Sequence, residues 1–196
     1  MANTRQSPSA ENLGDSSFAP SKEEQERYLS IARAAIRDHL DGRRESKPKP
    51  TPGETRLGAF VTLNKNGRLR GCIGRMESND PLSITIHAMA AAAAFEDPRF
   101  EPLSTRELDA ISVEITILGP RRKVDAPESI ELGRHGVWLR QGYASAVFLP
   151  QVAIEQGWDR PTLLRELCRK AGLRPDAWKD PDCSLMVFEG FVFGDP

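Results

Sequence analysis

The sequence Leu69-Arg70-Gly71-Cys72-Ile73-Gly74 holds a cysteine between a glycine and an isoleucine, two residues after an arginine. It follows a strand-forming segment, residues 57–63, and the turn-forming sequence Asn64-Lys65-Asn66-Gly67. Two strand-forming segments joined by Asn and Gly are typical of a β-hairpin. We therefore predict a hairpin whose second strand, residues 68–74, carries the cysteine.

The two faces of this second strand follow from the alternation of side chains along it. Leu69 and Ile73 are apolar and are predicted to face the core. Arg70 and Cys72 then face together toward a cleft or the solvent. The glycines of the motif weaken a strand, so they indicate a bulge or the close approach of another group. We place the candidate site at this motif.

The segment after the hairpin is predicted to be a helix and then a strand. Asp80-Pro81 supplies a capping aspartate and a first-turn proline, and the helix is expected to run to about Phe95. Its alanines, residues 90–94, allow another element to pack closely. Residues 111–117 alternate between apolar and polar side chains, which predicts a strand with Glu114 on its outward face.

The second half of the chain repeats this order. A hairpin is predicted over residues 136–149, helices over 150–156 and from Asp159 onward, and a last strand over 185–193. Hairpins require antiparallel pairing. The fold class is therefore α+β, with an antiparallel or mixed sheet built from repeated hairpin-helix-strand units.

Changes in composition divide the chain around one domain, residues 21–193. Ser21 and Glu24 have the spacing of a capping box, which predicts a helix start. The remaining divisions are a disordered N-terminal tail at residues 1–20, a helix at 21–41, an exposed proline-rich linker at 43–53, and the C-terminal end at 194–196.

Length and composition limit the class of protein. A chain of 196 residues, 39% hydrophobic and 28% charged, is typical of a globular domain with a sizeable core. The net charge of -1 gives no general attraction to nucleic acid or to an anionic membrane. No apolar run approaches the roughly eighteen residues that cross a bilayer. The first residues lack the apolar segment of a secretory signal, so we expect a cytoplasmic location.

The cysteines and histidines predict neither a disulfide framework nor a metal site. Cys72, Cys168 and Cys183 form an odd and sparse set, which fits a reducing compartment. No Cys-x-x-Cys motif is present, and the three histidines are scattered, so we predict no metal and no cofactor. Cys168 lies on the apolar face of a predicted helix and is expected to be a small core residue.

Several short motifs occur in a fixed order from about Ser21 to Phe193. They are residues 58–63, 69–74, 95–100, 133–137, 149–153, and the segment from 157 to 173. Together they resemble the AMMECR domain. The last segment is similar to the bacterial and archaeal branch, which is called AmmeMemoRadiSam system protein A. The long tail and the proline-rich linker are peripheral to this resemblance.

The resemblance implies an α+β fold in which two unequal lobes flank a cleft, with the cysteine motif near it. It also implies partners, a radical S-adenosylmethionine (SAM) protein and a Memo-type protein. No reaction is attached to the domain itself, and a fold does not determine a function. Three classes of function therefore stay open.

The first class is a cysteine-dependent enzyme or an accessory factor with a reactive cysteine. Cys72 is the predicted nucleophile, because a thiolate is the reactive form and the charge of Arg70 would lower its pKa. His135, in a glycine-flanked bend, is the predicted base. Glu114 would orient that histidine or transfer protons itself.

Each of these residues also has a structural interpretation. Cys72 fits a tight strand as a small filler between glycines. His135 fits a turn, and Glu114 fits a solvated carboxylate or one paired with an arginine. The three residues come from separate segments, so their meeting in space is a hypothesis.

The second class is a module that binds a small anionic ligand or a protein without catalysis. Its ligand contacts are assigned to Arg70, Gly71, Gly74 and Gln151. The third class is a nucleic-acid-binding protein, which would use arginines such as those of residues 121–123. We interpret that cluster as a solvated strand end. The near-zero net charge makes nucleic-acid binding the least favoured class.

Overall fold

The structure is a computed structural model, and it describes residues 18–43 and 47–195. The predicted tail, apart from Phe18 to Pro20, and part of the predicted linker lie outside these residues. The helices and strands are α1 (Lys22–Leu40), β1 (Ala59–Lys65), β2 (Arg68–Arg75), α2 (Leu82–Phe95), η1 (Thr105–Ala110), β3 (Ile111–Leu118), β4 (Arg122–Lys123), η2 (Pro127–Ser129), β5 (His135–Gln141), β6 (Ala144–Phe148), α3 (Pro150–Gln156), α4 (Arg160–Lys170), η3 (Ala177–Lys179) and β7 (Ser184–Gly194).

The strands form one antiparallel sheet whose order is symmetric about its centre. The order is β2-β1-β3-β7-β5-β6, and β4 pairs with β7 beside this path. Each half is a hairpin whose first strand pairs with the last strand of the same unit. The pair β3–β7 joins the halves. This arrangement confirms the predicted α+β class and the repeated units.

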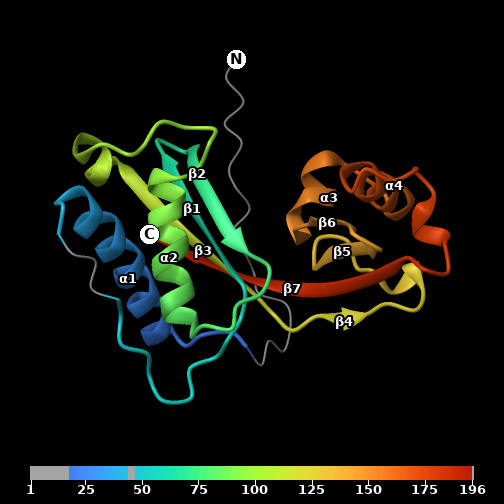
Figure 1. The fold of residues 1–196 in the computed structure, drawn as a ribbon, viewed down its shortest axis with the longest axis horizontal. Helices are drawn as coiled ribbons and strands as arrows, with labels where there is room; N and C mark the ends of the chain where they lie inside the picture. The colour runs from blue at the N-terminus through green and yellow to red at the C-terminus, as the bar shows by residue number, and fades with distance from the viewer. Residues whose placement is uncertain (1–17, 44–46, 196) are drawn as a thin grey trace.

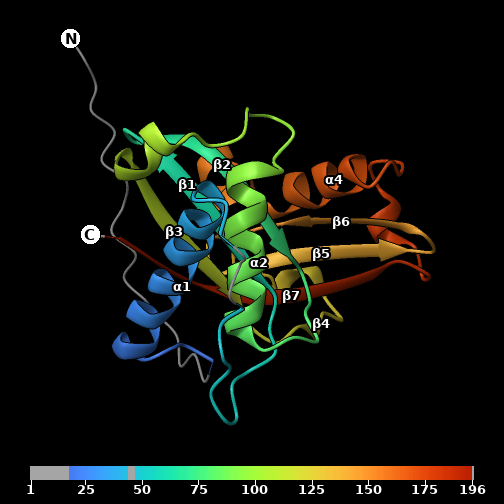
Figure 2. The same cartoon turned by 60° about the vertical axis from the view of Figure 1, so that its left-hand side comes forward.

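Two hydrophobic cores lie in two lobes of unequal size (Figure 1). In the first lobe, α1 and α2 cover one face of β1, β2 and β3 (Figure 2). In the second, α3 packs against β5, and α4 packs against β5 and β6 (Figure 1). The long strand β7 contributes to both, with Phe191 in the first core and Val187 in the second. Among the described residues, no helix has the length and apolar character that a membrane crossing requires.

The hairpin that carries Cys72 turns at two residues. Asn66 and Gly67 both have positive φ, 52° and 72°, which matches a type I′ turn. Asn64 and Lys65, predicted as part of the turn, are the last residues of β1. The narrower turn extends β1 by two residues, whereas β2 begins at Arg68 as predicted. Cys72 lies directly opposite Thr62 of β1.

The prediction that Leu69 faces the core is wrong, because the hairpin contains a bulge. The register shifts between Leu63 and Asn64: Leu63 pairs with Gly71, and Asn64 pairs with Leu69. Arg70 is the extra residue, so alternation fails at this point. Leu69 is 44% exposed as a result. Ile73, beyond the bulge, packs against the first core as predicted.

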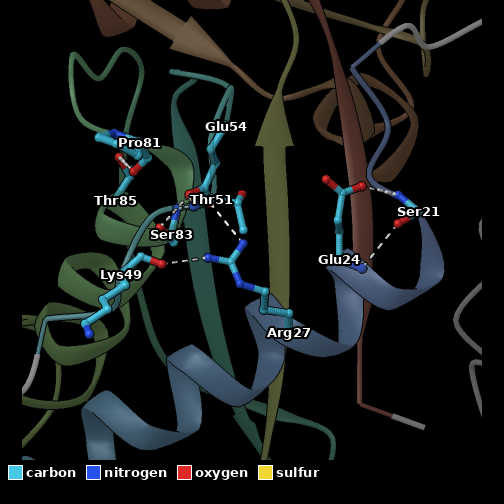
Figure 3. Close-up of polar contacts among 9 residues, drawn as sticks. All are labelled: Ser21, Glu24, Arg27, Lys49, Thr51, Glu54, Pro81, Ser83 and Thr85. Carbon is cyan, nitrogen blue, oxygen red and sulfur yellow. Dashed lines mark hydrogen bonds and ion pairs between the residues drawn. The ribbon is translucent and has the colours of Figure 1, made fainter.

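The first turn of α2 is capped by a distant glutamate. The predicted cap Asp80 makes no such bond, and the N-cap residue is Pro81. Glu54 instead accepts the backbone N–H and the hydroxyl of Ser83, both at 2.9 Å (Figure 3). Its side chain is only 2% exposed and also faces the guanidinium of Arg27 at 3.4 Å. The segment after the proline-rich linker is therefore part of the first lobe.

The end of the predicted linker is tied to α1 as well. Arg27 donates to the carbonyl of Lys49 at 3.1 Å, and the N–H of Thr51 donates to Glu54 (Figure 3). Burial and the neighbouring Glu54 carboxylate raise the pKa of Tyr28. The predicted capping box between Ser21 and Glu24, at the start of α1, is confirmed.

The basic cluster predicted as a solvated strand end is partly buried. The guanidinium of Arg121 lies 4.1 Å from the ring centre of Trp138 and forms an ion pair with Glu77. Burial lowers the pKa of Arg121. Arg121 also lines a groove of 510 Å³ at the ends of β2 and β3, together with Arg56 and Met76. Cys72 is not part of this groove.

Candidate functional site

A row of three polar side chains crosses the first half of the sheet. Cys72 on β2 pairs with Thr62 on β1, and Thr62 pairs with Glu114 on β3. Directly paired residues project to the same face of a sheet. Their neighbours Val61 and Ile115 are fully buried under the helices, so the three polar side chains project from the opposite face. We call these three residues the Cys72 row.

The thiol of Cys72 has a hydrogen-bond partner within this row. The hydroxyl of Thr62 donates to Cys72 Sγ, with 3.2 Å between Oγ1 and Sγ. Cys72 is partly exposed, unlike Cys168. The thiol of Cys72 therefore accepts a hydrogen bond and remains partly accessible.

The backbone of Cys72 lies on the free edge of the sheet, and the loop after α2 covers it. Its N–H donates to Asp97 Oδ2 at 2.8 Å, and its carbonyl accepts Arg99 Nη2 at 3.2 Å. The side chains of Asp97 and Arg99 are joined by two hydrogen bonds of 2.9 and 2.7 Å. These two side chains replace the missing neighbouring strand and leave no unpaired edge at Cys72.

The Asp97–Arg99 pair also sets the local charge. Hydrogen bonds from Arg99 and from the backbone of Cys72 hold the pKa of Asp97 well below its usual range, although its side chain is only 2% exposed. Arg99 is 54% exposed, and its pKa is raised by Asp97 with a smaller contribution from Cys72. A guanidinium is therefore fixed at the rim of the site, close to the thiol.

Arg70, which we predicted to lower the pKa of Cys72, is engaged elsewhere. Nε and Nη2 of its guanidinium each donate to an oxygen of the Glu107 carboxylate at 3.1 Å, and Lys65 Nζ lies 2.9 Å from the same carboxylate. The hydrogen bonds from Arg70, followed by the one from Lys65, hold the pKa of Glu107 well below its usual range. The positive charge beside Cys72 thus comes from Arg99.

Asp97 and Arg99 were not predicted as site residues. The predicted end of the helix at about Phe95 is confirmed, but no role was predicted for the loop that follows it. An aspartate two residues before an arginine was the available signal. It pointed to an ion pair, but nothing in the local sequence connected that pair with the edge of β2.

The side chain of Glu114 is half-buried and forms no hydrogen bond or ion pair with any residue in the described part of the chain. Burial raises its pKa. A carboxylate without a partner in such a place stays protonated to higher pH than usual, which suits it to transferring a proton.

The start of α3 lies on the same side of the sheet. A Cβ at Gly190 of β7 would meet Thr116 at 3.4 Å and Pro150 at 3.8 Å. Thr116 is two residues from Glu114 and shares its face. Gln151, predicted as a ligand contact, follows Pro150 and is exposed. It therefore lies on the side of the Cys72 row, at the second lobe.

The space at the two motif glycines is filled by protein groups. A Cβ at Gly71 would stand 2.1 Å from the carbonyl oxygen of Ala93 in α2. At Gly74 it would stand 2.2 Å from the ring of Phe60. The close approach that we predicted is thus made by a helix backbone on one face and an aromatic ring on the other.

His135, predicted as the base, begins β5. The strands β1, β3 and β7 stand between its strand and that of Cys72. The imidazole is 4% exposed. Its Nδ1 accepts the backbone N–H of Glu131 at 2.9 Å, and Nε2 lies 3.2 Å from the guanidinium of Arg122. In the described part of the chain, no hydrogen bond links His135 with Cys72.

The other two cysteines have environments that suppress reactivity. Cys168 is fully buried, and burial raises its pKa. Burial also raises the pKa of Cys183 to about 11. Within residues 18–43 and 47–195, no group of three or more His, Cys, Asp and Glu side chains is placed to hold a metal ion.

Comparisons with known proteins connect the chain to one family. The AMMECR1 family model matches residues 29–193. A protein of Methanopyrus kandleri is 42% identical over 182 residues, which cover 87% of this chain and 88% of that protein. A protein of Methanothermobacter thermautotrophicus is 40% identical over 186 residues, covering 90% and 97%.

A solved structure matches the fold of the chain as well. The crystal structure of an uncharacterized protein from Pyrococcus horikoshii matches with a TM-score of 0.80 at 36% identity, covering 91% of this chain and 94% of that chain. The matched family segment includes the hairpin with Cys72, both lobes and the strand that joins them.

Proposed function

The chain belongs to the AMMECR1 family, and we propose that the Cys72 row is the site of a cysteine-dependent group transfer. The observation that carries this proposal is the pairing of a hydrogen-bonded, accessible thiol with an unpartnered carboxylic acid in one row. Cys72 Sγ accepts from Thr62, and Glu114 stands directly across Thr62 on the next strand. Both groups face away from the core.

In the proposed reaction Cys72 is the nucleophile and Glu114 is the acid. The thiolate gives its electron pair to an electrophilic carbon of the substrate and forms a C–S bond. The bond to the leaving group breaks, and Glu114 transfers its proton to that group. The raised pKa of Glu114 favours this role, because burial stabilises the protonated form of the acid.

In the proposed reaction the substrate bridges Cys72 and Glu114 across Thr62. Two strand separations of roughly 4.8 Å lie between Cys72 and Glu114. The hydroxyl of Thr62, between them, orients the sulfur, and the guanidinium of Arg99 is held at the backbone carbonyl of Cys72. His135 has no part as a base in this reaction, because three strands separate it from Cys72.

The test is the alkylation rate of each cysteine in the folded protein, read by mass spectrometry across a pH series. We expect Cys72 to react at neutral pH while Cys168 and Cys183 do not. Glu114→Gln should leave this rate within about twofold, because Glu114 acts on the leaving group. An inert Cys72 in the folded chain would overturn the proposal and favour a non-catalytic binding module.

We also propose the narrower family assignment, a protein A of the AmmeMemoRadiSam branch in the cytoplasm. Its support is the motif resemblance of residues 157–173, together with three cysteines that are all free thiols. Under this proposal the protein acts with a radical SAM protein and a Memo-type protein. Co-purification of the untagged partners with the tagged chain tests it, and Cys72→Ser shows whether the contact depends on the thiol.

A further inference from the structure

A second pocket lies in the other lobe, between β4, β5 and β7. Its volume is 160 Å³, and Arg122, His135 and Glu189 supply its polar lining. Phe18 and Phe188 form apolar walls. The pocket contains none of the residues of the Cys72 row, so a ligand bound in it would be independent of the proposed group transfer.

Two hydrogen-bond donors point at the buried imidazole of His135. The backbone N–H of Glu131 points at Nδ1 over 2.9 Å, and the guanidinium of Arg122 points at Nε2 over 3.2 Å. A neutral imidazole has one acceptor nitrogen and one N–H. It accepts from Glu131 or from Arg122, but not from both.

The backbone donor decides which nitrogen is the acceptor. The N–H of Glu131 is fixed by the chain, whereas the side chain of Arg122 is exposed and able to turn. Nδ1 is then the acceptor, and Nε2 carries the proton. The result is two donors side by side, Nε2–H of His135 and the guanidinium of Arg122, with no acceptor between them.

Arg122 forms no ion pair in the part of the chain that the structure describes, because no carboxylate lies within 4 Å of its nitrogens. The acidic side chain of the lining, Glu189, is held by Arg134 at 3.0 Å. The charge of Arg122 therefore faces the pocket and is available to a ligand.

We propose that this pocket binds a small oxyanion, one oxygen of which accepts from Nε2–H of His135 and another from the guanidinium of Arg122. Such an anion satisfies both donors at once, and an arginine fork suits two oxygens of one phosphate or carboxylate. The volume suits a single anionic group better than a whole nucleotide, because pockets for drug-sized ligands begin at roughly 300 Å³.

The surroundings predict how binding depends on charge and pH. The charged groups around His135 are Arg122, Glu131, Arg134 and Glu189, and burial followed by Arg122 lowers the pKa of His135. The lowered pKa favours the neutral imidazole at pH 7, in which Nε2–H donates and the ring carries no charge. Binding of the anion should therefore persist above neutrality. Glu189, as a negative neighbour, should weaken it.

The experiment titrates the whole chain with inorganic phosphate at constant ionic strength, with chloride as the competing salt. The readout is the NMR shift of the Glu131 amide and of His135 Nε2. We expect a saturable shift at both. Arg122→Gln should weaken binding by roughly tenfold, since a charge-assisted hydrogen bond is lost. The matched control Lys123→Gln, which removes an exposed charge from the next residue of β4, should change it less than about twofold.

Two further measurements distinguish a phosphate ligand from a carboxylate ligand and show whether a loss of binding is caused by misfolding. Acetate in place of phosphate shows whether a carboxylate is accepted in the same place. Glu189→Gln should tighten phosphate binding, a gain that an unfolded variant does not produce. The proposal is overturned if the wild-type chain gives no saturable shift, or if the shifts lie away from Glu131 and His135. It is equally overturned if Arg122→Gln binds phosphate as the wild-type chain does.

Discussion

The carboxylate of Asp97 accepts the backbone N–H of Cys72 at 2.8 Å, across the free edge of the sheet. The guanidinium of Arg99, bound to the same carboxylate, closes the contact on the carbonyl of Cys72. The position of the thiol therefore depends on the loop after α2 as well as on its own strand. A change in this loop acts on the site without touching the sulfur.

Asp97→Asn should destabilise the protein by about 2 kcal/mol, because a buried charged acceptor of several hydrogen bonds becomes a neutral amide. Chemical denaturation monitored by circular dichroism measures this loss. Asp109→Asn is the matched control: Asp109 is exposed and has no partner in the described residues, so its change should stay within about 0.5 kcal/mol. Equal stabilities for the two variants would contradict the role given to Asp97.

The same aspartate should contribute to acid unfolding. Its folded pKa lies below its unfolded value of about 4, so its stabilisation is complete above that pH and is lost as the pH falls. Glu107 acts in the same direction through Arg70 and Lys65. Between roughly pH 4 and pH 2, stability should fall less steeply in Asp97→Asn than in the wild-type chain. Parallel slopes would show that Asp97 does not titrate with folding.

Gly71→Ala should be among the most damaging single changes in the first lobe. The new Cβ would stand 2.1 Å from the carbonyl oxygen of Ala93, so β2 and α2 must separate. We expect a loss of about 3 kcal/mol. Gly190→Ala is the control, because the nearest atoms to its Cβ, at 3.4 Å or more, are at ordinary contact distance. Thermal unfolding of the two variants should differ clearly.

The parts of the fold that could be predicted are those that depend on a few neighbouring residues. Asn66-Gly67 specifies the turn, strict alternation marks β3, and the repetition of hairpin, helix and strand anticipated the symmetric strand order. Each of these signals acts within a few residues. Their physical basis is the backbone preference of glycine and the burial of one face of a strand.

The missed features all depend on contacts between distant segments. The glycines indicated a bulge or a close approach, but the sequence did not show that the bulge exposes Leu69 or that Arg70 binds Glu107. The cap of α2 came from Glu54, and not from the adjacent Asp80. Within the site, Cys72 and Glu114 project from the same face, whereas the residues that hold the edge of β2 come from a loop 25 positions farther on. The spacing of residues along the sequence does not predict which distant segments contact each other.

Glu54→Gln tests the distant cap. The amide retains one oxygen but loses the charge that binds Ser83 and faces Arg27, so we expect a loss of about 2 kcal/mol. Hydrogen exchange of the first amides of α2 should increase more than that of β7. The matched variant Glu155→Gln, at an exposed position of α3 without a partner in the described residues, should change neither quantity. If Glu54 contributes little as a cap, Glu54→Gln and Glu155→Gln will have the same stability and the same hydrogen-exchange rates in α2.

Thr62→Val tests whether the hydroxyl between Cys72 and Glu114 serves the thiol. Valine keeps the shape of threonine and removes the donor that lies 3.2 Å from Cys72 Sγ. The thiolate then loses a hydrogen bond, so alkylation of Cys72 at neutral pH should slow by roughly tenfold. Thr62→Ser, which keeps the hydroxyl, should react nearly as fast as the wild-type chain. If serine and valine slow the reaction equally, packing at β1 sets the rate, and the hydroxyl has no part in activating Cys72.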